Sequence, residues 1–470
     1  MASPITFGVE LEFNLAYLDA DNILEDPTET RQLFFPTTAE ATKFIEQIYR
    51  DTYGGSIPSH LSESVAKFAY QKSIQYAVRD TLISIGCPVS GYSWNGDGDP
   101  SAWDILDDSS ISATYGTAYN WFPMEINSPA LPFTPASLEL ILKVCTTITE
   151  KYLTDPNEST GLHVHLSAGT TTFDFRTMQK LFVILWTFET QISSLHAEVR
   201  QNNYYCRGLR EASHMADEFP RTWGVNPSNL QGIVEFYNCE NIESVLRAAE
   251  CAQRTKVLAF NGNNALEKVR YPASNSKPTV EVRQHAGTLD GERIVSWIKL
   301  LTGIIQRMET IHPESFLQLI QLAELEKWEK VEEVSKNSFN QVNLGPIPAE
   351  STLTIIDILE YLDLHESADY YRDRLYKIKG KSRRPQLRTF SWNTKAHKSS
   401  RSSTASKEVL KAEKTGMMKV FQSLMLVGAV CEDEDVGGLN FNPDDRVWSM
   451  IRRVDGRRHK LTPLFRPFSE

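Results

Sequence analysis

Residue types suited to binding cations recur along the chain at a spacing of two. Residues 159–169 read STGLHVHLSAG, in which His163 and His165 are separated by one residue. Near the N-terminus, ITFGVELEFNL carries Glu10 and Glu12 at the same spacing. Because successive side chains of a β-strand point to opposite faces, each pair lies on one face of its strand. Apolar residues alternate with these groups, so we predict two strands that each have one apolar face and one ionisable face.

Two further segments show the same pattern. MEINSPAL contributes Glu125, and TVEVRQH contributes Glu281, Arg283 and His285. The four ionisable faces together hold four glutamates, three histidines, one arginine and no lysine. Carboxylates with a few imidazoles suit divalent cations, especially Mg²⁺ and Mn²⁺. The alternative is the exposed face of a half-buried sheet whose histidines bond to neighbours, but this selection of residue types favours a metal-lined groove.

The spacing of the two N-terminal glutamates indicates more than one cation. At a rise of about 3.3 Å per residue, Glu10 and Glu12 lie about 6.6 Å apart, so each could contact one of two neighbouring ions. Several carboxylates on one dry face are unfavourable without cations, because like charges repel and lone charges resist burial. Arg283, on the same face as Glu281, supplies a planar guanidinium for phosphoryl oxygens. This grouping indicates nucleotide chemistry.

The elements that must position these residues are a mixture of strands and helices. Strands are expected in SAWDILDDSSI, in TAYNWFPMEINSPAL and in KPTVEVRQHAG, besides the two strands above. Helices are expected over residues 38–85 with Gly86 as terminator, from the cap Thr134 and Pro135 onward, over 175–199 and over 291–308. Because the strands do not alternate regularly with crossover helices, we predict an α+β fold with a mainly antiparallel sheet.

Composition limits the classes of protein that need to be considered. The chain has 470 residues, of which 41% are hydrophobic and 23% charged, and a formal net charge of −11. It is long enough for a large core, and its negative charge disfavours nucleic acid as a partner. The chain shows neither an apolar run of eighteen residues nor a signal-peptide pattern, so we expect a cytoplasmic protein without a membrane partner. Six widely spaced cysteines without a CxxC pair indicate neither a disulfide framework nor a cysteine zinc site.

Four of these motifs, in the same order, resemble those of the amidoligase family, which is related to glutamine synthetase and glutamate–cysteine ligase. The motifs are FGVELEF, MEINSPAL, TGLHVHLSAG and TVEVRQHAGTLDGERIVSWI, and the resemblance covers residues 5 to about 305. WDILDDSSI and EVRQNNYYCRGLR also resemble segments typical of the family. The resemblance implies a curved, glutamine synthetase-like antiparallel sheet that forms a funnel with helices packed outside. It also implies ATP-dependent, ADP-forming amide synthesis through an acyl phosphate.

The resemblance assigns roles residue by residue. His165 resembles the residue beside the nucleotide phosphates, and Arg283 resembles the arginine that steadies the transferring phosphoryl group. The positions that resemble metal ligands are Glu10, Glu12, Glu125, His163 and Glu281. The implied cofactors are therefore ATP and at least two Mg²⁺ or Mn²⁺ ions.

Four further residues are candidates for handling the substrates. Asp108, in the DDSS turn, is a candidate base for deprotonating the amine, although an aspartate also commonly caps such a turn. Arg200 and Arg210 flank NNYYC and could hold a substrate carboxylate, with surface charge as an equal alternative. Asn261, in KVLAFNGNNALEK, is the candidate for an asparagine that relatives place before the last metal strand.

We expect residues 1–312 to form the catalytic domain, and the region that follows it differs in composition. We expect a helical extension over 313–375, a basic loop or linker over 376–408, and a C-terminal segment over 409–470 whose role the sequence does not indicate. Residues 377–407 contain ten basic residues and no acidic ones. This stretch is either a solvated connector or a lid that holds an anionic ligand.

Three functions are compatible with the sequence. The first is an ATP-dependent carboxylate–amine ligase that acts on a small-molecule or peptide carboxylate and an amine. The second is a metal-dependent hydrolase in which the same ligands hold zinc and activate water. The third is a ligase-like fold that binds a nucleotide without catalysis. A homo-oligomer is compatible with all three.

Overall fold

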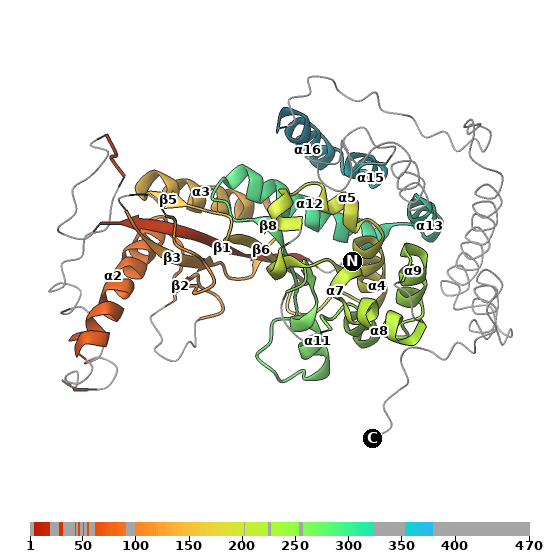
Figure 1. Cartoon of the computed structure of the whole chain (residues 1–470), viewed down its shortest axis with the longest axis horizontal. Coiled ribbons are helices and arrows are strands. Elements are labelled where there is room, and N and C mark those ends of the chain that lie inside the picture. Colours follow the sequence, from red (N-terminus) through yellow and green to blue (C-terminus); the bar gives the residue numbers. More distant parts are fainter. Residues whose placement is uncertain are drawn as a thin grey trace. The chain divides into compact units, whose positions relative to one another are not determined.

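The structure is a computed structural model in which part of the chain is described (Figure 1). The described residues are 4–18, 28–31, 62–90, 99–115, 117, 119–201, 203–223, 227–252, 257–322 and 353–378, with the isolated residues 43, 46, 47, 50, 54 and 55. The C-terminal segment 409–470, the basic linker beyond 378 and most of the expected helix before residue 62 lie outside them.

Contacts divide the chain into two compact units. The first unit comprises Met1–Asp174, His196–Ser213 and Ala249–Gly303. The second comprises Phe175–Leu195, His214–Ala248 and Ile304–Glu470. Every candidate site residue lies in the first unit. The expected domain borders at 312 and 375 stay predictions.

The first unit is built on one antiparallel sheet. Eight strands of the described chain form it, in the order β2-β3-β1-β6-β8-β7, and β4 and β5 also pair with β1. The strands are β1 (Ile5–Tyr17), β2 (Asp104–Asp107), β3 (Asn120–Asn127), β4 (Leu131–Pro132), β5 (Thr154–Asp155), β6 (Gly161–Ala168), β7 (Phe260–Asn261) and β8 (Val280–Ala286). The predicted α+β class and antiparallel pairing are confirmed, whereas the funnel stays a prediction.

The central strand β1 shows the predicted alternation. Ile5, Phe7, Val9, Leu11 and Phe13 are all buried and form its apolar face. The residues between them lie on the opposite face, which carries both N-terminal glutamates. Burying the apolar set stabilises the sheet by about 2 kcal/mol per large side chain, so a shift of register by one residue would be strongly unfavourable.

The helices of the first unit are α2 (Ser62–Ser84), α3 (Pro135–Lys151), α6 (Glu198–Gln201), α7 (Leu209–Ala212), α11 (Asn263–Arg270), α12 (Gly291–Thr310) as far as Gly303, and the short 3₁₀ helix η2 (Tyr204–Cys206). As predicted, α2 is followed by Gly86, whose φ of 90° suits glycine. The predicted cap of α3 is also confirmed, since Thr134 Oγ1 accepts a hydrogen bond from the amide of Ser137 at 3.3 Å. Figure 1 shows α3 and α12 along one side of the sheet.

The prediction of one helix over 175–199 is wrong. The chain there forms α4 (Phe175–Thr187), α5 (Glu189–Ser193) and α6. Phe188, between the first two, has φ −112° and ψ 24°, which are not helical values, and its ring is fully buried. Apolar periodicity continues through this position, so the break cannot be read from the pattern of hydrophobic residues.

The second unit is helical in its described part. Besides α4, α5 and the end of α12, it contains α8 (His214–Trp223), α9 (Asn229–Tyr237), α10 (Ile242–Ala248), α13 (Pro313–Gln321), α15 (Ile355–Tyr361) and α16 (His365–Ile378). The rings of Phe182 and Phe236 stack with centroids 6.0 Å apart. At Gly232 a Cβ would lie 2.0 Å from the Trp186 ring, so only glycine lets α9 approach α4 this closely. In the described part of the chain, no helix is long and apolar enough to span a membrane.

Glu235, on α9, provides a test of the packing in the second unit. The side chain is buried, and burial raises the pKa of its carboxyl to about 7. Because the native pKa exceeds the unfolded value, this group favours folding at acid pH, and that contribution is lost as the pH rises through 7. We expect Glu235→Gln to stabilise the protein by about 2–3 kcal/mol more at pH 8 than at pH 5.

Urea unfolding of both proteins at the two pH values measures this difference. Exposed Glu240 on the following turn is the matched control, and Glu240→Gln should show no such dependence on pH. Any cost of the new amide is the same at both pH values, so it cancels in the comparison. An equal effect of Glu235→Gln at pH 5 and pH 8 would contradict the raised pKa.

Candidate functional site

The register of the sheet brings the predicted residues together on one face. Across β1 and β6 the Cα atoms of Glu10 and His163 are partners, and across β1 and β3 those of Glu12 and Glu125 are partners. On the other side of β6, His165 is paired with Glu281. Directly opposed residues of an antiparallel pair have side chains on the same face. Strands more than a hundred residues apart in sequence therefore build a single site.

A β-bulge interrupts the pairing of β6 with β8 at the centre of this face. Leu162 is paired with His285 and Val164 with Val282, so Arg283 and Gln284 both lie opposite His163. The extra residue reverses the alternation along β8. His285 therefore shares the face of Leu162, where its ring contacts those of His196 and Trp297 at 5.5 and 5.9 Å. The prediction that His285 lies on the ionisable face is wrong, because a strict period of two does not hold across a bulge.

Glu10 is the centre of the hydrogen-bonded network. Its Oε2 lies 2.8 Å from Nδ1 of His163, and its Oε1 lies 2.8 Å from Nε2 of His165. The remaining ring nitrogen of His165, Nδ1, lies 3.2 Å from Oγ1 of Thr279, which fixes the orientation of the ring. Burial opposes ionisation of Glu10, but the two histidines hold the pKa of its carboxyl well below the usual range. Both imidazoles are buried.

The first cluster of possible metal ligands is Glu10, His163 and Glu281. Each offers a donor atom within 4.8 Å of the other two. Glu281 is also bonded to the guanidinium of Arg283, and its Oε2 accepts a hydrogen bond from Nδ2 of Asn261 at 3.0 Å. Burial raises the pKa of Glu281, but His165 and Arg283 outweigh it and lower the pKa overall. The two carboxyl groups of this cluster are therefore ionised. Together with the imidazole they form a donor set that suits a borderline divalent cation.

The second cluster is Glu12, Asp108 and Glu125, again with donor atoms within 4.8 Å of one another. Burial, together with Glu10, Glu12 and Asp108, raises the pKa of Glu125 to about 8. Burial also raises the pKa of Glu12, and Asp108 adds to this effect. Three mutually repelling carboxyl groups with only oxygen donors fit a hard cation such as Mg²⁺ or Mn²⁺.

Hydrogen bonds to neighbouring strands hold the second cluster. The amide of Gly161 donates to Oε2 of Glu12 at 2.6 Å, and Nδ2 of Asn127 donates to Oε1 of Glu125 at 2.7 Å. Asp108 accepts a hydrogen bond from the amide of Ser110 at 2.7 Å. This contact caps the turn, which was the alternative to a catalytic role for Asp108. The two clusters adjoin, since Nε2 of His163 lies 3.4 Å from Oε1 of Glu12.

The three candidate arginines lie in different surroundings. Arg283 points into the site, with Nη1 at Glu281 and 3.4 Å from Nδ1 of His163. Burial opposes its charge, but Glu281 outweighs burial and raises the pKa of the guanidinium. Arg200 is 2% exposed, and its side chain donates to backbone carbonyls of β8. Arg210 is half-buried on α7.

Two supporting residues were not among the predicted site residues. Thr279 bonds to His165 and Asn127 bonds to Glu125, as described above. Each lies two residues from a predicted ligand in the sequence, Thr279 before Glu281 and Asn127 after Glu125. The spacing of two that identified the ligands thus also carried a signal for these residues.

The site is thus defined as two adjacent acidic clusters with one arginine on an antiparallel sheet, a donor set suited to two divalent cations and an anionic ligand. A family model described as "Putative amidoligase enzyme" matches residues 3–305, well over half of the chain. The chain therefore belongs to this amidoligase family, and the resemblance of the four motifs is confirmed. Membership supports an enzyme of the ligase class. No curated protein and no solved structure gives a significant match.

Glu125→Gln tests whether the second cluster accepts a cation. Without added cations at neutral pH, we expect the variant to melt at a higher temperature than the parent protein, because the folded parent must keep a carboxyl with a pKa of about 8 protonated at a pH at which the unfolded chain ionises it. A cation at 100 times its Kd stabilises a folded protein by about 2.7 kcal/mol, and the variant should lose the part of the increase in melting temperature that Mg²⁺ or Mn²⁺ produces by binding to this cluster.

Thermal melts with and without each cation measure both effects. Glu158→Gln is the matched control, because Glu158 is an exposed glutamate in the turn before β6. Equal cation-dependent shifts for the parent and Glu125→Gln would contradict a cation site at this cluster.

Proposed function

We propose that the protein is an ATP-dependent carboxylate–amine ligase that forms an amide through an acyl phosphate and releases ADP. The observation that carries the proposal is the pair of adjacent acidic clusters beside Arg283, in a chain of the amidoligase family. A carboxylate is a poor acyl donor until it is phosphorylated. Phosphoryl transfer relies on positioning and charge stabilisation, for which such a site provides the groups.

In this proposal the two clusters hold two divalent cations. Glu10, His163 and Glu281 hold one, and Glu12, Asp108 and Glu125 hold the other. When bound, Mg²⁺ or Mn²⁺ would neutralise negative charge on the β- and γ-phosphates of ATP. Asp108 thus acts as a ligand, in place of the general-base role for which it was a candidate.

Arg283 and His165 act on the nucleotide. The substrate carboxylate attacks the γ-phosphorus, and the bond from phosphorus to the oxygen of ADP breaks. Arg283 stabilises the negative charge on the phosphoryl oxygens during this transfer, because its guanidinium can form two parallel hydrogen bonds. His165, held by Glu10 and Thr279, lies beside the phosphates.

The amine then completes the amide. It attacks the acyl carbon, the bond from carbon to the phosphate oxygen breaks with its electron pair, and the proton that the nitrogen loses passes to the departing phosphate. The partners we propose are a small-molecule or peptide carboxylate and an amine, without nucleic acid. Asn261 and Arg210 remain our candidates for substrate binding, and the surroundings of Arg200 indicate another role.

The test is ATP-dependent phosphate release with Mg²⁺ or Mn²⁺ across a panel of carboxylic acids, with and without amines. We expect release that needs both an acid and an amine and that Glu281→Ala abolishes. Arg283→Lys should lower kcat about 10²- to 10³-fold, because a lysine cannot reproduce the planar contact with the phosphoryl group.

Two results would contradict the ligase. Tight binding of Mg-ATP without turnover on any pair of substrates would indicate a nucleotide-binding module. One bound zinc ion with no affinity for ATP would indicate the metal-dependent hydrolase. Exposed Glu158→Gln serves as the control for both measurements, and it should behave like the parent protein.

A further inference from the structure

The bulge in β8 determines where Arg283 points. Arg283 and Gln284 occupy the place of one residue opposite His163, and a bulge bends its strand and redirects side chains. The amide of Arg283 donates to the carbonyl of Ala259 at 2.8 Å, which attaches the bulge to the β7 side of the sheet. A bulge also takes carbonyl groups out of the ladder. Buried carbonyls of this kind need other donors.

Arg200 supplies these donors. Its Nη2 donates to the carbonyl of Arg283 at 2.6 Å, and its Nε donates to the carbonyl of Gln284 at 3.4 Å. Arg200 is 2% exposed, so its guanidinium is not open to a substrate on the surface of the protein. A buried arginine is costly unless its donors are bonded. Both contacts therefore tie this side chain to the backbone of the bulge.

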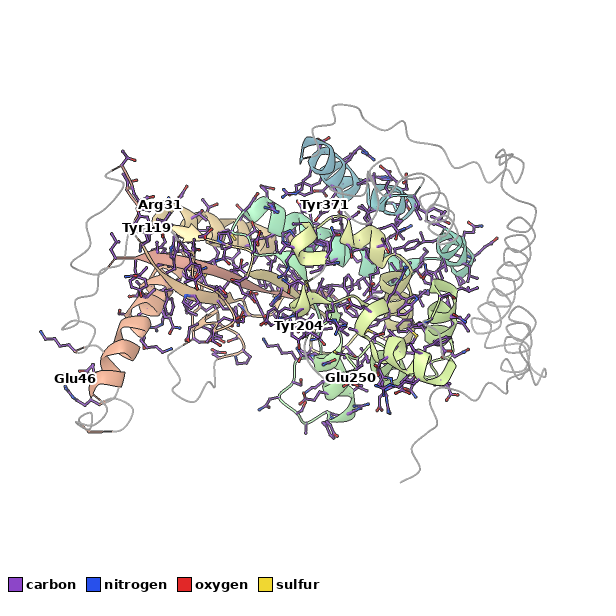
Figure 2. All side chains as sticks on the ribbon, in the orientation of Figure 1. Arg31, Glu46, Tyr119, Tyr204, Glu250 and Tyr371 are labelled. Atoms are coloured by element: carbon purple, nitrogen blue, oxygen red, sulfur yellow. The ribbon has the colours of Figure 1, made fainter. Side chains whose placement is uncertain are left out.

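The segment that carries Arg200 is in turn fastened to β8. Nε of Arg283 donates to the carbonyl of Tyr205 at 3.4 Å, so each arginine bonds to the backbone of the other's segment. The thiol of Cys206 donates to the carbonyl of Arg200 at 2.9 Å. The tyrosine of this segment labelled in Figure 2, Tyr204, is 58% exposed. The attachment is thus made by the buried residues Arg200 and Cys206 and by the backbone carbonyl of Tyr205, not by the exposed tyrosine rings.

We propose that Arg200 is a positioning residue that fixes the bulge of β8 and thereby holds Arg283 beside Glu281 and His163. The proposal rests on the proposed ligase function, in which Arg283 stabilises the transferring phosphoryl group. Arg200 acts through Arg283 and does not bind a substrate carboxylate. Its loss therefore affects phosphoryl transfer more than binding.

A double-mutant cycle tests this coupling. Arg200→Lys keeps the charge, but its single nitrogen does not reproduce the planar arrangement in which Nε and Nη2 of the guanidinium each reach one carbonyl. We expect kcat for phosphate release to fall about 10- to 100-fold while KM for ATP changes by less than about threefold. In the Arg283→Lys background the same substitution should have little further effect, because both act on one interaction. Arg221→Lys, at an exposed arginine of α8, is the control and should leave kcat unchanged.

Two kinetic outcomes would overturn the proposal. A tenfold or larger rise in KM for the acid with unchanged kcat would make Arg200 a substrate-binding residue. Additive losses in the two backgrounds would show that Arg200 does not act through Arg283. If Arg200→Lys does not fold, Cys206→Ala loosens the same segment more gently. It should lower kcat about two- to fivefold, again only when Arg283 is present.

A second readout separates this proposal from the ligase assignment. If the parent protein consumes no ATP with any substrate pair, the proposed function fails, and the position of Arg283 is measured directly. The NMR signal of its Nε–H group is identified by its loss in Arg283→Lys. Arg200→Lys should shift this signal and Arg221→Lys should not. An unshifted signal would overturn the positioning role without any assay of activity.

Discussion

Repulsion between carboxylates on one buried face is the constraint on which the rest of the site depends. The structure meets it differently in the two clusters. Glu10 and Glu281 have histidines and an arginine beside them, and the pKa of each is lowered. Glu12 and Glu125 lack comparable compensation, and the pKa of each is raised. One cluster is thus largely neutralised by the protein itself, whereas the carboxyl groups of the other retain their protons to higher pH.

The sheet makes this asymmetry possible because each cluster draws on different strands around β1. The neutralised cluster combines β1 with β6 and β8, where the bulge brings a guanidinium to the site face. The acidic cluster combines β1 with β3 and with the turn that follows β2, and its three possible ligands all donate oxygen. The difference in charge between the two halves of the site therefore follows from strand order.

Patterns within single segments of the sequence predicted the features that depend on neighbouring residues alone. Alternation fixed the faces of β1 and β6, and the residue types on those faces indicated the ligands. Features that depend on distant pairing were not predictable from such patterns. The bulge reverses the face of His285, and the backbone of Phe188 leaves helical geometry although the apolar periodicity continues. The surroundings of Arg200 are likewise set by carbonyl groups about 83 residues away in sequence, which no spacing rule connects to it.

The order of the strands along the sequence also sets when the site can be completed during synthesis. β1, the middle strand, is made first, and Glu10 leaves the ribosome 271 residues before Glu281, its neighbour in the first cluster. At roughly 5–20 residues per second, this interval lasts on the order of tens of seconds. Until β8 is made, neither Glu281 nor Arg283 is present to join the acidic side chains of β1. The nascent chain thus postpones the electrostatic cost of the site until β8, which carries the compensating arginine, is available.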